Sequence, residues 1–167
     1  ASLDEAGYLR VIRSKTAKLF EASSRLAAVL AGSDTAQEEA CATYGQALGT
    51  AFQIIDDVLD YDGDTQEMGK NLGDDLREGK ATLPLIAAMQ RGSATQAQMV
   101  RHAIENGSTD QLDAIVTVVR ETGALDVARE AAAAEAHRAI EAISTLPDSA
   151  YRTALLQLAA QLLQRRT

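Results

Sequence analysis

The sequence has no tryptophan, two prolines and one cysteine among its 167 residues. With Cys41 alone the chain can form no internal disulfide, so the cysteine content gives no sign of secretion. A lone cysteine of this kind is usually a small buried apolar residue. Few prolines leave long stretches free to form helix. Because aromatic residues make up 4% of the chain, we expect a core of aliphatic side chains.

Basic residues and long apolar runs are also scarce. The 16 Lys and Arg are outnumbered by 24 Asp and Glu, which gives a formal charge of −8. A general nucleic-acid binder would need a basic face, and so would a protein held by an anionic membrane. No apolar run approaches the roughly 18 residues of a membrane span, and no basic-then-apolar leader opens the chain. We therefore expect a cytoplasmic protein with no nucleic-acid partner and no stable membrane insertion.

Apolar residues recur at helical intervals along nearly the whole chain, and no stretch demands a sheet. The length suits one domain with a substantial core. The pattern predicts an all-α bundle with helices over about Ser2–Gly32, Thr35–Tyr61, Thr82–Gln90, Thr95–Glu105, Asp110–Glu121, Leu125–Ile143 and Ser149–Arg165. The polar, glycine-punctuated segment Asp62–Gly79 is predicted to be a loop with at most one short helical turn.

Three aspartates stand near the end of the second predicted helix. At about 100° per residue, Asp56 and Asp60 lie one above the other, and Gln53 shares their face. Stacked carboxylates repel one another, and a hard divalent cation such as Mg²⁺, which takes oxygen ligands, would reverse that cost. A solvated acidic face is the alternative, which the apolar flanks disfavour: Ile54, Ile55, Val58 and Leu59.

Two lysines follow in the acidic segment, each beside a glycine. Lys70 and Lys80 suit an anion that a metal has partly neutralised, namely a diphosphate, and the glycines allow the backbone to come close to it. Asp74 could complete the outer shell of the metal or bind its waters. Either lysine alone would be read as a solubilising residue, but together with the aspartates they predict a metal–diphosphate site.

Two other cation or phosphate motifs fail on spacing. An EF-hand loop begun at the third aspartate would need glycine at its sixth position and glutamate at its twelfth, where Thr65 and Asn71 stand. A P-loop needs four residues between its glycines and Ser or Thr after its lysine. Here five residues separate Gly63 from Gly69, and asparagine follows Lys70.

These residues resemble a known family. Gly49–Asp60 (GTAFQIIDDVLD), followed by Gly69-Lys70 and Gly73-Asp74-Asp75, resembles the second aspartate-rich motif of trans-type polyprenyl diphosphate synthases. Upstream, Tyr8–Phe20 is similar to the Lys-Thr helix of that family, and Gly79–Leu85 matches the segment that closes its site. The resemblance runs over essentially the whole chain, and its details look closest to the bacterial long-chain members of the octaprenyl type.

The resemblance implies the all-helical isoprenoid-synthase fold and head-to-tail elongation of an allylic diphosphate by isopentenyl diphosphate, with Mg²⁺ as cofactor. By position, Asp56 and Asp60 would hold Mg²⁺ directly or through water, with Asp57 in support. The lysines implied to contact the allylic diphosphate are Lys15, Lys70 and Lys80. The resemblance also implies that Thr16 and Gln53 place oxygen dipoles beside the developing cation. Without the family, Lys15 and Thr16 would be read as ordinary helix surface.

One departure from the family is large. The family has two facing aspartate-rich motifs, and residues 1–167 contain one. We therefore expect the C-terminal part of a polyprenyl synthase, whose N-terminal half would carry the other motif and the isopentenyl diphosphate site. The whole enzyme is expected to be a homodimer making octaprenyl or a similar long-chain diphosphate for quinone side chains. The chain alone is expected to be inactive.

Two alternatives stay open. The chain could be a non-catalytic helical partner of a complete synthase, although intact aspartates and lysines disfavour this. It could also be a Mg²⁺-binding helical module without prenyl chemistry. His102 and His137 have no partner at ligand spacing, so we expect surface or packing roles for them.

Overall fold

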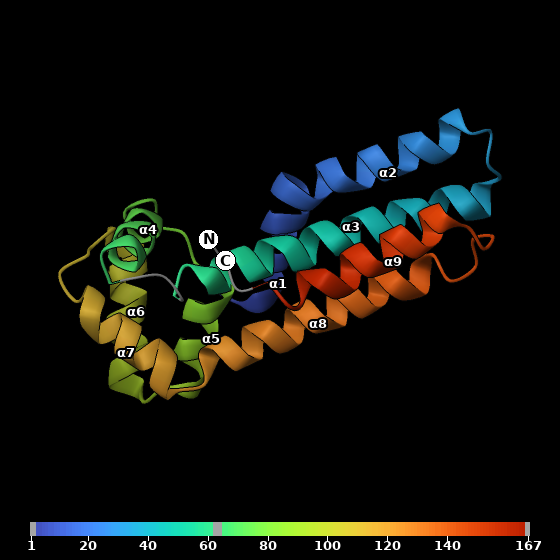
Figure 1. Ribbon diagram of the computed structural model, residues 1–167. Helices are drawn as coiled ribbons and strands as arrows, with labels where there is room; N and C mark the ends of the chain where they lie inside the picture. The colour runs from blue at the N-terminus through green and yellow to red at the C-terminus, as the bar shows by residue number, and fades with distance from the viewer. Residues whose placement is uncertain (1–2, 62–64, 166–167) are drawn as a thin grey trace. The chain divides into compact units, whose positions relative to one another are not determined.

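The computed structural model describes residues 3–61 and 65–165, and the side chains of residues 65–70 lie outside the description (Figure 1). All regular structure in these ranges is helical and no strand occurs in them, which confirms the all-α prediction. The elements in chain order are α1 (Glu5–Ile12), the π-helical turn η1 (Arg13–Ala17), α2 (Lys18–Leu30), α3 (Thr35–Leu59), α4 (Thr65–Arg77), α5 (Leu83–Arg91), α6 (Ala94–Asn106), α7 (Leu112–Glu121), α8 (Ala124–Ala142) and α9 (Ala150–Leu162).

The described residues form two compact units. The first takes in residues 3–8, 56–61 and 65–129, and the second takes in residues 9–55 and 130–165. No described helix is long and apolar enough to cross a membrane.

In the first unit, α5 lies at the centre of the packing. It contacts α6 and α7, and α4 contacts the same two helices. Every residue of Leu83–Met89 is buried, as expected for a helix covered on all sides. Pro84 stands in the first turn of α5, where the missing N–H has no helical partner to lose, as the sequence predicts. A capping box of Ser93 and Gln96 begins α6, and Gly107 ends it with a φ of 61°.

The loop predicted over Asp62–Gly79 is wrong, because α4 is helical over Thr65–Arg77. Leu72 and Leu76 stand one turn apart and are 1% and 0% exposed, so this helix has a buried apolar face. Each glycine within a helix costs about 1 kcal/mol relative to alanine, but packing of an apolar face outweighs propensity in most proteins. The glycines alone indicate a loop, but the buried face formed by Leu72 and Leu76 determines the helical structure of this segment.

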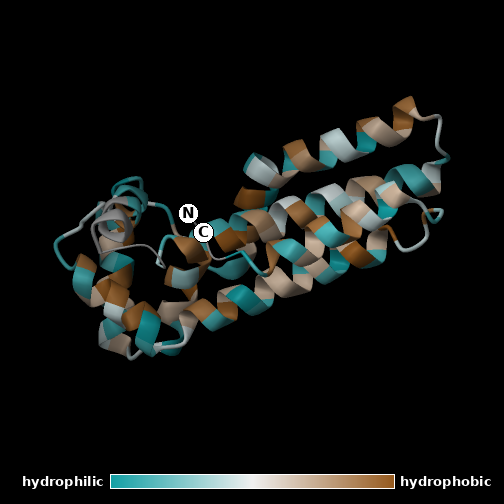
Figure 2. Ribbon diagram, in the orientation of Figure 1, coloured by the Kyte–Doolittle hydropathy of each residue, from teal (hydrophilic) through white to brown (hydrophobic). Residues whose placement is uncertain are grey.

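In the second unit, α2, α3, α8 and α9 supply long helices (Figure 1). Apolar and polar residues are mixed along them, as expected for helices that bury one face (Figure 2). Tyr44 on α3 donates its hydroxyl to the carbonyl of Leu155 on α9 at 2.9 Å, and burial raises the pKa of this phenol to about 12. Cys41 is half-buried, and burial raises the pKa of its thiol.

The turn η1 was not predicted, and it is packed tightly against α3. A Cβ at Gly49 would lie 2.8 Å from the Cα of Ala17, the last residue of the turn. Glycine is therefore needed at this point for the two backbones to approach. π-turns are rare and frequently lie at functional sites, and this one contains both residues of the Lys-Thr pair.

Candidate functional site

The last turn of α3 separates its three aspartates into two environments. Asp56 and Asp60 are partly exposed, and the amide of Asp60 donates to the carbonyl of Asp56 at 3.2 Å, which places them one helical turn apart as predicted. Asp57 instead lies inside the unit and is 3% exposed. The two outer carboxylates are therefore the ones accessible to a cation from solvent.

The buried Asp57 is held by a residue distant in sequence. The hydroxyl of Tyr8, on α1, donates to Oδ2 of Asp57 at 2.7 Å, and both side chains are buried. Burial raises the pKa of the Tyr8 phenol well above its usual range, and the charges of Asp57 and Asp75 raise it further. Tyr8 therefore keeps its proton and remains a donor. Sequence patterns cannot indicate this pairing, because 49 positions separate the partners.

A fourth carboxylate belongs to the same cluster, and it is Asp75. It is 9% exposed and accepts from Nζ of Lys80 at 2.6 Å. Its charge also contributes to raising the pKa of Asp60. Burial disfavours the charged ammonium of Lys80, but the hydrogen bond to Asp75 and nearby carboxylates outweigh this and raise its pKa. Lys80 is thus a cation beside the aspartates.

Asp74, the residue predicted from the sequence for the outer shell of the metal, lies at the surface. It is exposed and pairs with Arg77 at 2.7 Å, one turn further along α4. The buried face of α4 follows the i, i+3, i+4 spacing of Leu72, Asp75 and Leu76. The same spacing would have selected Asp75 from the sequence if the segment had been recognised as a helix.

The environment of Asp60 is unfavourable to its negative charge. Burial raises its pKa, and the charges of Asp75 and Asp56 add to the rise, while a hydrogen bond from Asn71 at 3.1 Å and the charge of Lys80 act against it. Desolvation and like charges both disfavour ionisation of a carboxyl group. A cation bound here would be attracted by the same charges that repel one another without it.

The hydroxyls of Tyr61 and Thr82 are buried and lack a hydrogen bond of normal geometry to any described residue. Burial raises the pKa of the Tyr61 phenol, and the neighbouring Thr82 hydroxyl offsets part of this rise, so the two groups lie close together. The carbonyl of Tyr61 accepts from Arg120 at 3.2 Å. The two hydroxyls are therefore buried polar groups without a satisfied hydrogen bond, which are uncommon in protein cores.

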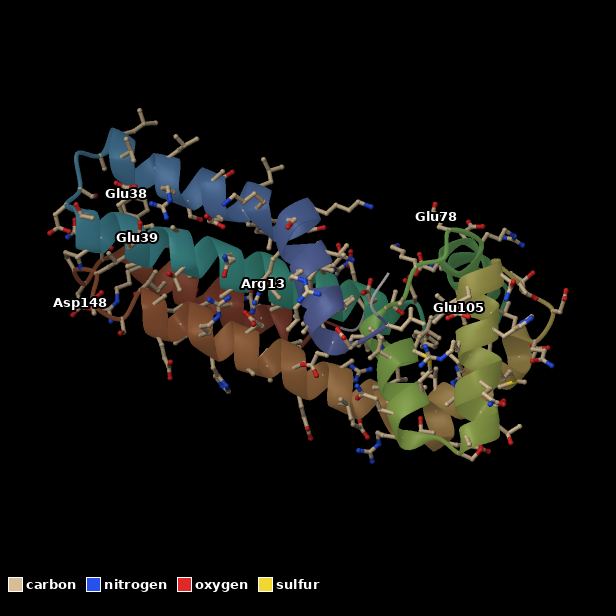
Figure 3. The ribbon with its side chains drawn as sticks, turned by 180° about the vertical axis from the view of Figure 1, so that it is seen from behind. Arg13, Glu38, Glu39, Glu78, Glu105 and Asp148 are labelled. Carbon is tan, nitrogen blue, oxygen red and sulfur yellow. The ribbon has the colours of Figure 1, made fainter. Side chains whose placement is uncertain are left out.

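The second unit holds three further predicted site residues: Lys15, Thr16 and Gln53. Thr16 Oγ1 donates to Oε1 of Gln53 at 2.9 Å, so these two predicted neighbours are in contact. Lys15 is exposed and makes no ion pair with a described residue. At the start of the same turn Arg13, which is labelled in Figure 3, lies on η1. It donates to Glu135 on α8 at 2.7 Å. The side chain of Lys70 lies outside the described residues, so its predicted contact with diphosphate stays a prediction.

The carboxylate oxygens of the aspartates are the type of ligand that Mg²⁺ prefers. In the described part of the chain no three Asp, Glu, His or Cys side chains converge as a complete metal cage. Mg²⁺ does not need one, because it keeps several waters and is often held by one or two carboxylates together with substrate phosphates. The outward pair Asp56 and Asp60 matches that requirement, with Asp75 and Lys80 behind it.

Comparison with known proteins extends over nearly the whole chain. The family described as Polyprenyl synthetase matches residues 1–121. Octaprenyl diphosphate synthase of Haemophilus influenzae is 52% identical over 156 residues, which are 93% of this chain and 47% of the relative. The enzyme of the same description from Escherichia coli is 48% identical over 98% of this chain and 51% of its own length. The chain spans about half the length of the curated relatives it matches.

Similarity to solved structures supports the same family. A polyprenyl synthase from Caulobacter crescentus, crystallised with calcium and isoprenyl diphosphate, is 42% identical with a TM-score of 0.87 over 99% of this chain and 52% of that one. A decaprenyl diphosphate synthase from Rhodobacter capsulatus has the same TM-score at 38% identity, over 98% of this chain and 51% of its own. These likenesses confirm the predicted isoprenoid-synthase fold, and the chain belongs to the polyprenyl synthetase family.

Proposed function

We propose that this chain is the C-terminal part of a trans-type polyprenyl diphosphate synthase, and that it carries one of the two aspartate motifs of the active site. The observation that carries the proposal is the last turn of α3, where Asp56 and Asp60 face outward one turn apart while Asp57 is buried. The names of the relatives support the reaction class. The parent enzyme would join an allylic diphosphate to isopentenyl diphosphate.

In this reaction the carbon–oxygen bond of the allylic diphosphate breaks, the double bond of isopentenyl diphosphate attacks the resulting cation, and a proton is lost. Asp56 and Asp60 would hold Mg²⁺. When bound, the ion draws charge from the diphosphate oxygens and makes the diphosphate a better leaving group. The lysines proposed to bind that diphosphate are Lys15, Lys70 and Lys80. Positively charged donors aimed at a developing anion act strongly in a site that excludes water.

The remaining residues support this set. Asp75 replaces Asp74 in our proposal for the outer shell of the metal, because Asp75 is buried beside Lys80 and Asp74 pairs with Arg77 at the surface. Thr16 and Gln53, which contact one another, would place oxygen dipoles beside the allylic cation. For the parent enzyme we further propose a cytoplasmic homodimer, an N-terminal half with the facing aspartate motif, and an octaprenyl or similar product.

Calorimetry on the purified chain tests the metal–diphosphate site. Mg²⁺ is expected to bind more tightly in the presence of inorganic diphosphate, and Asp56→Asn with Asp60→Asn should abolish the effect. Asp74→Asn is the matched control and should leave it unchanged, since this carboxylate is exposed and paired with Arg77. Mg²⁺ binding that ignores diphosphate would instead favour a metal-binding module. We also propose that the chain alone is inactive, and steady product formation by the purified chain would contradict this.

A further inference from the structure

The hydrogen bond between Tyr8 and Asp57 joins the start of the described chain to the aspartate turn. The donor is on α1 and the acceptor on the last turn of α3, and they are 2.7 Å apart. Tyr8 is 6% exposed and Asp57 is 3% exposed, so neither side chain can exchange this partner for solvent without moving. A buried carboxylate needs donors to remain charged, and the tyrosine hydroxyl is one of them.

The hydrogen bond also fixes the rotation of the last turn of α3 about the helix axis. Successive residues of a helix are about 100° apart, so the direction of Asp57 sets the directions of Asp56 and Asp60 on the same turn. Rotation of this turn would expose the buried carboxylate and turn the outer pair away from its present direction. Metal ligands need to be held within about 0.5 Å of their working positions by the groups around them. An anchor on the inner side of the turn meets this need.

We propose that Tyr8 is a positioning residue, which holds Asp57 on the inner side of the α3 terminus and thereby presents Asp56 and Asp60 outward as a pair. This inference rests on the proposed metal–diphosphate site, which it deepens. It assigns different tasks to the adjacent aspartates: Asp57 anchors the turn, while Asp56 and Asp60 meet the cation. Mutation of groups that orient metal ligands from behind typically costs about 10–100-fold in metal affinity.

Tyr8→Phe removes the hydroxyl and keeps the ring, and Tyr44→Phe is a matched control. Tyr44 is also buried, 3% exposed, and donates to a carbonyl at 2.9 Å in the other unit. Both variants are expected to lower the thermal midpoint of the metal-free chain. Tyr8→Phe should also weaken Mg²⁺ affinity, measured with inorganic diphosphate, by about ten-fold or more, and Tyr44→Phe should leave it unchanged. Unchanged affinity in Tyr8→Phe, or an equal loss in both variants, would overturn the inference.

Hydrogen exchange separates this inference from the proposed function. In Tyr8→Phe the amides of residues 56–61 should exchange about ten-fold faster relative to those of α6, because a hydrogen bond to a buried charge is lost. Tyr44→Phe should show no such local change. If the wild-type chain binds no Mg²⁺ with diphosphate, the proposed function fails, while the exchange data still decide whether Tyr8 positions the turn.

A second pair of variants covers the case in which Tyr8→Phe does not fold. Asp57→Asn keeps an acceptor for Tyr8 and removes the buried charge, and adding Tyr8→Phe then deletes only the bond. The two variants have the same net charge. A lower Mg²⁺ affinity and faster local exchange in the double variant than in Asp57→Asn would therefore measure the effect of the hydrogen bond alone. Equal behaviour of the two variants would refute the positioning role.

Discussion

Lys80 donates to Oδ1 of Asp75 at 2.6 Å, and the two ends of this ion pair are buried to different depths. The carboxylate side chain is 12% exposed, whereas that of the lysine is 45% exposed. A second pair on the same segment, Arg77 with Asp74, has both side chains more than half exposed. The two ion pairs thus provide an internal comparison between a charge that solvent screens and one that it does not.

Lys80→Met is expected to destabilise the chain by about 1–3 kcal/mol, because it leaves the buried carboxylate of Asp75 without its cation. Arg77→Met should change the free energy of unfolding by no more than about 0.5 kcal/mol, since exposed pairs contribute little. Urea denaturation of both variants measures the difference. Equal losses would show that depth of burial does not distinguish the pairs.

Asp60→Asn is expected to stabilise the metal-free chain at neutral pH. Because burial and neighbouring charges raise the pKa of Asp60, the folded chain binds its proton more tightly than the unfolded chain does. The free energy of unfolding therefore falls as the pH rises from the ordinary range of an aspartate through the raised value, and the cost is complete above it. Asparagine carries no charge and keeps an acceptor for Asn71.

The expected gain in thermal midpoint, in EDTA at neutral pH, is on the order of 2 °C. It should vanish near about pH 3, where an aspartate is protonated in both states. Asp74→Asn serves as the control, because its carboxylate is exposed and paired with Arg77. A gain for Asp60→Asn of the same size at both pH values would contradict the electrostatic explanation.

Gly49→Ala and Gly73→Ala should act in opposite directions. A Cβ at Gly49 would meet backbone 2.8 Å away, so we expect a loss of about 1–3 kcal/mol from overpacking. At Gly73 the nearest described atom would be 3.5 Å away, in ordinary contact, and alanine should add up to about 1 kcal/mol through helix propensity. Thermal denaturation tests both signs, and stabilisation by alanine at both sites would be inconsistent with the close approach of η1 and α3.

Thr16→Val is expected to cost about 0.5–1.5 kcal/mol, because it removes the donor to Gln53 within a partly buried contact. Thr117→Val is the control, since its hydroxyl is exposed and donates to a carbonyl one turn back in its own helix. Denaturant titration of the two variants gives the comparison. A loss at Thr117 as large as that at Thr16 would mean that helix propensity, and not the contact with Gln53, sets the effect.

What the sequence could predict was local. Helical periodicity, Pro84 in a first turn and Gly107 at a helix end are signals within a few residues, and the structure agrees with each. The sequence does not distinguish Asp74 from Asp75, because the difference depends on the face that α4 buries and the segment was predicted to be a loop. The partnership of Tyr8 with Asp57 has no local signal at all.

The turn η1 has a consequence for how the length of this segment can vary. A π-turn accommodates one more residue than the α-helical path it interrupts, so deletion of any single residue within Arg13–Ala17 would let the helix close regularly. Because the turn already absorbs this extra residue, the helical stretches on either side would keep nearly the same phase after the deletion. The deletion would instead shift the residues within the turn, which include Lys15 and Thr16. Over evolutionary time, single-codon deletions between Arg13 and Ala17 should therefore leave the flanking helices in phase and alter the Lys-Thr pair alone.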